Sequence, residues 1–173
     1  MITTVLSLLL MQEAPAAATP TPTPAPPCSG ENYDAFDFWV GEWDVYPAGS
    51  DRQVATSRIE RLYNGCAVRE NWMSASGGDG GSLNAYNPQT GLWHQTWIGS
   101  APGDVEFVGG PVDGVMVING YWPGALGPDT NPLQRITYTL QDDGSVRQHG
   151  EASEDHGLTW TTNFDLIYRP QAE

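Results

Sequence analysis

From residue 31 onward, the chain alternates between short runs rich in Val, Ile, Thr, Tyr and Trp and clusters of Gly, Asn, Asp and Pro. The first group fits a pleated sheet surface, and the second supplies the backbone angles of tight turns. The pattern predicts ten strands and no long helix. In chain order these strands span 38–46, 54–62, 66–74, 82–87, 92–98, 104–108, 115–121, 133–140, 145–152 and 159–168.

Short connections between the predicted strands favour antiparallel hairpins between neighbours. Closure of such a sheet removes its edge strands. We therefore expect an all-β fold, an antiparallel up-and-down β-barrel of about ten strands within residues 31–170. The main rival, a β-sandwich, needs longer crossover connections than this chain offers. A short helix at 31–37, capped by Asn32, is expected to precede the first strand.

The N-terminal segment differs in composition from the rest of the chain. Residues 1–18 combine a brief apolar run with small residues at 14–18, which is typical of a signal peptide. Residues 19–30 form a Pro/Thr-rich linker, expected to be disordered and extended because proline fixes φ and removes N–H donors. The alternative for 1–18 is a disordered cytoplasmic tail. The signal-peptide interpretation predicts a periplasmic or secreted protein.

Two cysteines, Cys28 and Cys66, are the only ones in the chain, and their spacing matches no metal-ligand motif. No metal site is therefore predicted. In an exported protein, a disulfide between them would tie the N-terminal arm to the barrel. The alternative is two unpaired thiols, with Cys66 serving as a small core residue.

Charge narrows the range of partners. The chain carries 21 acidic residues against 7 basic ones, which gives a formal net charge of -14. Such a surface repels phosphate, so no nucleic acid is expected as a partner and contact with anionic membranes is disfavoured. The apolar run at 5–11 is too short to cross a bilayer, so no membrane insertion is expected. The oligomeric state is left open.

Two local patterns predict structural contacts. Gly41 and Trp43 form a Gly-x-Trp at the start of the first strand, and Arg169 lies at the end of the last. In a closed barrel Trp43 would plug the floor, and the Arg169 guanidinium would cover its ring in a cation–π contact. The segment 153–160 has the S-x-D-x-G-x-T-W spacing of an Asp-box turn, in which Asp155 satisfies loop amides and Trp160 folds beneath the hairpin.

Four segments carry a family resemblance, namely 36–43, 66–72, 93–97 and 153–160. Together they resemble a group of uncharacterised exported bacterial proteins with a lipocalin-like fold, in the calycin superfamily. The resemblance implies a barrel that binds small apolar or amphipathic ligands, and in a minority of members a hydratase or isomerase activity. Some ten-stranded members hold haem through a His. No haem-ligand motif maps onto His94, His149 or His156, so no cofactor is predicted.

Strand parity selects candidate lumen residues, because alternate side chains face the interior. In 66–72, Glu70 and Trp72 share the face expected to point inward. A carboxyl group buried there should have a raised pKa and would anchor a ligand or act as a general acid/base. The alternative is a structural ion pair with an arginine such as Arg58, or exposure to solvent.

In 92–98 we favour the face with Trp93 and Trp97 pointing inward, which leaves His94 at the surface. The opposite facing remains open, since both faces carry apolar bulk. Tyr86 is a candidate hydrogen-bond donor to a ligand, or ordinary strand filling. His149 either joins Glu70 in a polar lumen cluster or faces water.

These residues predict a small-molecule binding protein. The ligand would be hydrophobic or aromatic and would contact Glu70, Trp72, Tyr86, Trp93, Trp97 and His149. The alternative is a cofactor-independent hydratase, lyase or isomerase with Glu70 as general acid/base, assisted by His149 or Tyr86. Haem binding through one His is a third possibility.

Overall fold

The computed structural model describes residues 27–172. The expected signal peptide and most of the expected linker lie outside the described residues. The ten strands are β1 (Gly41–Pro47), β2 (Ala55–Leu62), β3 (Ala67–Ser74), β4 (Gly80–Asn87), β5 (Leu92–Gly99), β6 (Val105–Val112), β7 (Val115–Tyr121), β8 (Leu133–Leu140), β9 (Val146–Ser153) and β10 (Thr161–Pro170).

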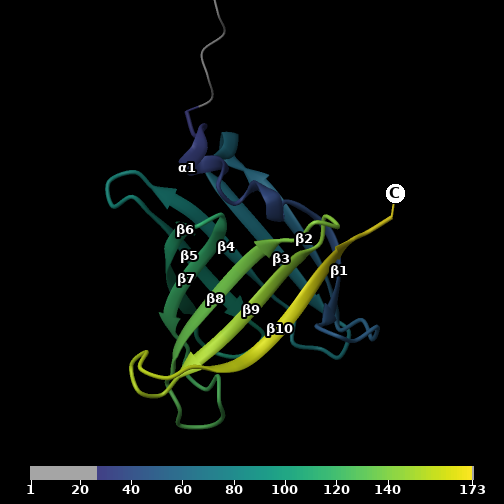
Figure 1. Cartoon of the computed structure of the whole chain (residues 1–173), viewed down its shortest axis with the longest axis vertical. Coiled ribbons are helices and arrows are strands. Elements are labelled where there is room, and N and C mark those ends of the chain that lie inside the picture. The colour runs from purple at the N-terminus through teal and green to yellow at the C-terminus, as the bar shows by residue number, and fades with distance from the viewer. Residues whose placement is uncertain (1–26, 173) are drawn as a thin grey trace, which may run out of the picture.

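The strands form one closed antiparallel barrel, which confirms the fold predicted from the sequence (Figure 1). Each strand pairs with its neighbours in the chain, and β1 closes the ring against β10 from Trp43↔Pro170 to Pro47↔Leu166. Within residues 27–172, no helix is long and apolar enough to cross a membrane.

The segment before β1 corrects one expectation. Instead of one helix over 31–37, the chain forms α1 (Glu31–Asp34) and a 3-10 turn, η1 (Asp37–Trp39), so β1 begins at Gly41. Asn32 lies inside α1 and does not cap it. Instead, the Gly30 N–H donates to Asp34 Oδ2 at 3.1 Å, so the side chain of the last residue of α1 reaches back to the residue before the helix.

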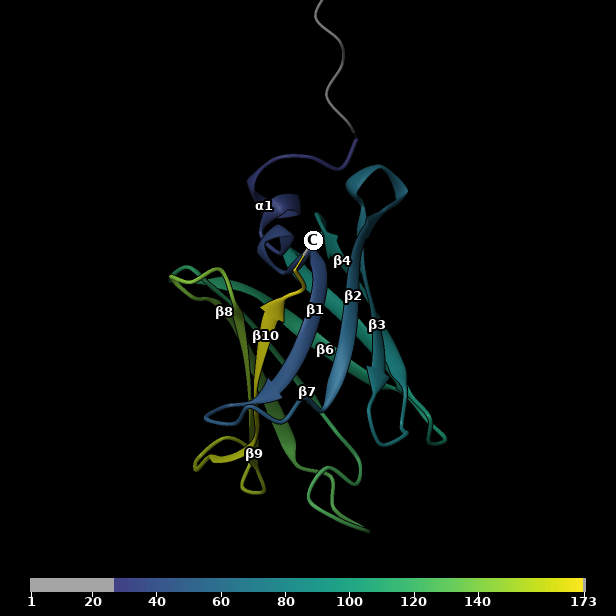
Figure 2. The same cartoon turned by 90° about the vertical axis from the view of Figure 1, so that its right-hand side faces the viewer.

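Together, α1 and η1 form a plug (residues 31–39) at one end of the barrel, and the long loops lie at the other end (Figure 2). Trp39 is fully buried, and Phe36 is stacked on it with ring centroids 4.9 Å apart. Tyr138 of β8 packs against both rings. The indole N–H of Trp93 donates to Asn32 O at 3.1 Å, which holds α1 against β5.

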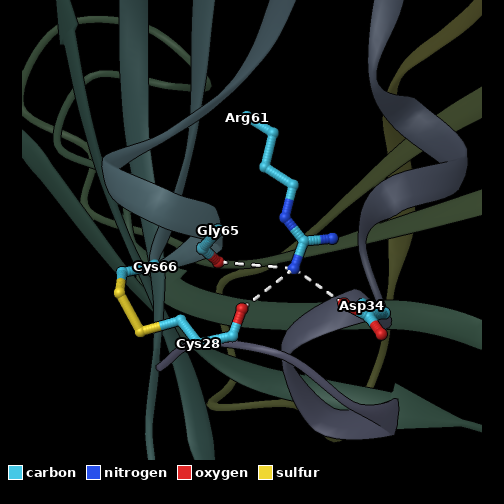
Figure 3. The surroundings of a disulfide bond; sticks show 5 residues. All are labelled: Cys28, Asp34, Arg61, Gly65 and Cys66. Carbon is cyan, nitrogen blue, oxygen red and sulfur yellow. Dashed lines mark hydrogen bonds and ion pairs between the residues drawn. A yellow bond between two sulfur atoms is a disulfide. The ribbon is translucent and has the colours of Figure 1, made fainter. Parts of the chain in front are cut away.

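A disulfide and an arginine fasten this plug to the barrel wall (Figure 3). Cys28 is bonded to Cys66, with a Cα–Cα distance of 4.9 Å. Arg61 of β2 donates to Cys28 O at 3.3 Å and forms ion pairs with Asp34, at 2.7 Å, and with Asp37. The half-buried guanidinium therefore holds both short helical turns in place.

The expected contact between Trp43 and Arg169 is wrong. Trp43 points inward and donates from Nε1 to Trp39 O at 2.9 Å, whereas Arg169 is exposed. Its guanidinium lies 4.3 Å from the ring centre of Tyr46 and 3.3 Å from Asp51 Oδ1. Because Arg169 is paired in register with Asp44, it shares the outward parity of that residue, and Trp39 fills the floor instead.

The Asp-box turn joins β9 to β10. Asp155 Oδ1 accepts hydrogen bonds from Ser153 Oγ at 2.7 Å and from the Thr159 N–H at 2.8 Å, and Thr159 Oγ1 donates to Oδ2 at 2.6 Å. These bonds, those from Thr159 first, lower the pKa of Asp155 to about 2. Trp160 donates to Gly157 O at 3.0 Å, and the Arg135 guanidinium lies 4.2 Å from its ring centre.

A register shift in β10 changes which side chains face the lumen. Thr162 is opposite Glu151, and Phe164 is opposite Gly150, so Asn163 is an extra residue between two ladder positions. Such a bulge inverts the alternation before it. Thr162 therefore lies on the outer face, while Phe164 covers Gly150 from inside the barrel.

The Gly150→Ala substitution is expected to destabilise the protein by about 1–3 kcal/mol, because a Cβ there overlaps the Phe164 ring. Chemical denaturation would measure the loss. Gly110→Ala in β6 is the matched control, since a Cβ at Gly110 meets no atom within 4 Å. Equal effects at the two glycines would contradict this packing.

Candidate ligand-binding site

A cavity of about 210 Å³ occupies the lumen between the plug and the open end. Its walls come from β3, β5, β6, β8, β9 and β10 and from the loop after β7, so distant parts of the chain enclose one space. Most of the lining is aromatic or aliphatic. The lining residues are Glu70, Trp72, Gln95, Trp97, Phe107, Trp122, Ile136, Tyr138, Gln148, Phe164, Leu166 and Tyr168.

Three of the sequence-predicted residues meet in this cavity, namely Glu70, Trp72 and Trp97. In β3 the buried and lining positions alternate as parity requires, and in β5 the tryptophan face points inward. The indoles of Trp72 and Trp97 give the cavity flat apolar walls, and Glu70 places a carboxyl group at its deep end.

Trp93 and Tyr86 do not line the cavity. Both lie under the plug, where the Trp93 ring meets Phe36 at a centroid distance of 5.7 Å and Tyr86 meets Tyr33 at 5.1 Å. Trp93 points into the lumen as predicted, but Phe36 of the plug fills the space beside it. Their role in this structure is to anchor the plug.

His149 is outside the barrel, which agrees with the alternative that it faces water, and its predicted place among the ligand-contacting residues is wrong. In β9, Val146, Gln148 and Gly150 point inward, and His149 bonds with Thr162 Oγ1 at 3.1 Å on the outer surface. Neither His94 nor His156 lines the cavity either. All three histidines of the chain are therefore placed away from any ligand held in the lumen.

A ring of hydrogen-bonded polar side chains crosses the lumen at the deep end of the cavity. This polar ring consists of Glu70, Ser82, Asn84, Gln95, Tyr138, Gln148 and Tyr168, all buried. On one side, Ser82 Oγ donates to Glu70 Oε2 at 3.2 Å, and Asn84 Nδ2 donates to Ser82 Oγ at 3.0 Å. Gln95 Nε2 then donates to Asn84 Oδ1 at 2.7 Å.

On the other side, the Tyr138 hydroxyl oxygen accepts from Gln95 Nε2 at 3.3 Å and from Gln148 Nε2 at 3.0 Å. The Tyr168 hydroxyl lies 2.8 Å from Gln148 Oε1 and 3.2 Å from Glu70 Oε1, which closes the ring. Buried polar groups that satisfy one another in this way hold their side chains in fixed positions.

Burial raises the pKa of Glu70 from its ordinary value of 4.5 to about 7. Hydrogen bonds from Ser57, Ser82 and Tyr168 oppose this shift but do not cancel it. No arginine lines the cavity, so nothing in its walls neutralises an ionised Glu70. The group can therefore exchange a proton near neutral pH, which is the property required of a general acid/base.

The cavity leads toward the outside past two tryptophans. A second hollow, of about 490 Å³, lies among the loops at the open end and is lined in part by Ala101, Pro102 and Asp104. Trp97 and Trp122 line both this hollow and the inner cavity. They therefore form the boundary between the inner cavity and the mouth.

Several lining residues were not among the predicted site residues. Gln95 and Gln148 were detectable from parity, because each lies between inward neighbours on its strand. Tyr138 and Tyr168 carry a polar atom on an otherwise apolar face, which sequence alone does not distinguish from core packing. Trp122 follows β7 in a loop, where no strand periodicity applies.

Within residues 27–172, no group of three or more His, Cys, Asp or Glu side chains is placed to hold a metal ion. The Cys28–Cys66 disulfide also removes both thiols as metal ligands. The cavity lining itself offers aromatic packing, hydrogen bonding and one carboxyl group.

The fold and cavity define the class of this protein as a closed ten-strand antiparallel β-barrel, compatible with a lipocalin-like barrel. Its aromatic-rich lumen fits ligand binding in general. No protein-family model matches the sequence, and no curated protein matches it either.

Proposed function

We propose that the protein binds a small hydrophobic or aromatic molecule in its lumen. The observation that carries this proposal is the cavity of about 210 Å³ with Trp72, Trp97 and Trp122 in its walls. An apolar protein cavity of about 150 Å³ is large enough for benzene. A single substituted ring therefore matches the space. Burying about 200 Å² of such a ligand at about 25 cal/mol per Å² corresponds to a dissociation constant on the order of 0.1 mM.

We further propose that this binding takes place outside the cytoplasm, in the periplasm or after secretion. The disulfide between Cys28 and Cys66 supports this, because such bonds persist in oxidising compartments.

Quenching of tryptophan fluorescence by a panel of single-ring aromatic compounds tests the proposal. Saturable quenching is expected for the wild-type protein. Ile136→Phe fills part of the cavity and should weaken binding at least about tenfold, which corresponds to about 1.4 kcal/mol. Leu83→Phe adds the same ring type at an exposed position of β4 and should leave binding unchanged. Equal affinities of the two variants would contradict lumen binding.

A second candidate function is that of a hydratase, lyase or isomerase without a cofactor. The specific observation in its favour is Glu70, whose pKa is raised to about 7 beside the cavity. Tyr86 and His149, the assistants expected from the sequence, do not line the cavity, whereas Tyr168 contacts Glu70. Turnover that disappears in Glu70→Gln while ligand affinity survives would favour the enzyme. Unchanged binding with no turnover in either protein would favour a binding protein.

A further inference from the structure

The hydrogen-bond count of Tyr138 singles out its hydroxyl group. A phenol hydroxyl has one hydrogen to donate and lone pairs to accept with. Gln95 Nε2 and Gln148 Nε2 both donate to the Tyr138 oxygen, at 3.3 and 3.0 Å. Among residues 27–172, no acceptor receives the Tyr138 hydrogen, and the residue lines the cavity.

The second tyrosine of the polar ring differs in this respect. The Tyr168 hydroxyl has two acceptors within reach, Gln148 Oε1 and Glu70 Oε1, so its hydrogen is used inside the protein. Of the two tyrosines in the polar ring, Tyr138 is therefore the one whose hydroxyl hydrogen is available to a ligand. Burial and the nearby Glu70 charge raise the pKa of Tyr138 above its ordinary value, which keeps that hydrogen in place at neutral pH.

Charge restricts the ligand further. The cavity wall contains one ionisable carboxyl group, Glu70, and no cationic side chain. The arginines nearest to it in sequence lie on the outer surface, where Arg69 pairs with Glu60. A carboxylate ligand would lose its hydration without gaining a partner cation, which is costly in an apolar cavity. An uncharged acceptor oxygen avoids this cost.

We propose that the cavity selects an uncharged aromatic carbonyl compound, whose oxygen accepts a hydrogen bond from the Tyr138 hydroxyl. The inference rests on the proposed function and specifies its ligand class. The aromatic part of the ligand packs against Trp72 and Trp97, and the carbonyl oxygen reaches the polar ring at the deep end. Tyr138 is then the residue that determines specificity.

Acetophenone and α-methylstyrene test this proposal, because they have nearly the same shape and differ in C=O against C=CH₂. Each is titrated into wild-type protein and into Tyr138→Phe. Loss of the hydroxyl should weaken acetophenone binding roughly three- to tenfold and leave α-methylstyrene binding unchanged. The comparison is made within each variant, so a general distortion of the cavity affects both compounds alike.

Two controls sharpen the result. Tyr86→Phe removes a hydroxyl outside the cavity and should change neither affinity. Benzoate at pH 8 should not bind the wild-type protein. The infrared carbonyl stretch of bound acetophenone should lie at lower wavenumber in wild type than in Tyr138→Phe, because hydrogen bonding weakens the C=O bond.

The outcomes separate this proposal from the one on which it rests. If both compounds bind and Tyr138→Phe affects them equally, or neither of them, the hydroxyl makes no bond to the ligand and this inference fails while lumen binding stands. If Ile136→Phe and Leu83→Phe have the same effect on the affinity of every ligand tested, the proposal of lumen binding itself fails. Tight binding of benzoate would overturn the charge argument.

Discussion

Glu70→Gln is expected to remove a pH dependence of stability worth about 3 kcal/mol. The folded protein holds the Glu70 proton up to about pH 7, whereas the unfolded chain releases it near 4.5. Between these values the native state binds more protons, so its stability falls as pH rises. The contribution is complete below about 4.5 and lost above about 7. Glutamine cannot ionise, so the free energy of unfolding of the variant should rise relative to that of wild type between about pH 4.5 and about pH 7.

Denaturant unfolding at several pH values between 4 and 8 measures this difference. Other groups titrate in the same range, so the informative quantity is the wild-type free energy of unfolding subtracted from that of the variant. Glu154→Gln, at an exposed turn position, is the matched control and should give a flat difference. A flat difference for Glu70→Gln as well would show that Glu70 titrates as it does in the unfolded chain.

Replacing both cysteines by serine is expected to cost about 4 kcal/mol of unfolding free energy. Cys28 and Cys66 are 38 residues apart in sequence, and the bond between them restricts the unfolded chain over that span. In the folded state the bond holds the plug near Arg61, whose ion pairs then form without further loss of chain entropy.

Chemical denaturation with and without a thiol reductant provides the measurement. Reduction should lower the stability of wild type toward that of the Cys28→Ser/Cys66→Ser variant and should leave the variant unaffected. Hydrogen exchange of residues 31–39 should accelerate more than that of the barrel strands, because the plug depends on this bond. Identical stability of oxidised and reduced wild type would contradict the assignment.

Much of the barrel was predictable from the sequence because its determinants are local. Turn residues mark nearly every hairpin, and all ten predicted strands overlap strands of the structure. The largest boundary difference lies in β6, which was predicted to end at residue 108 and continues to Val112. Gly109, Gly110 and Pro111 indicate a turn in the sequence, but pairing with β7 keeps them extended.

The site was less predictable because it depends on what lies between strands. Parity placed Glu70, Trp72 and Trp97 correctly, but it could not show that Phe36 of the plug occupies the space next to Trp93. A single extra residue, Asn163, inverted the facing of the start of β10. The polar ring joins side chains that are far apart in sequence, so no local pattern contains it.

Within residues 27–172, the plug covers one end of the lumen, and Trp97 and Trp122 separate the inner cavity from the mouth at the other end. A ligand bound as proposed would enter and leave past Trp97 and Trp122, because the disulfide-held turns fill the opposite end. The residence time of the ligand would then depend on side-chain motion of Trp97 and Trp122. Its selectivity would depend on the polar ring, and on Tyr138 above all. Substitutions at Trp122 would therefore change the rate of ligand release, while the Tyr138 hydroxyl would still determine the class of ligand that is bound.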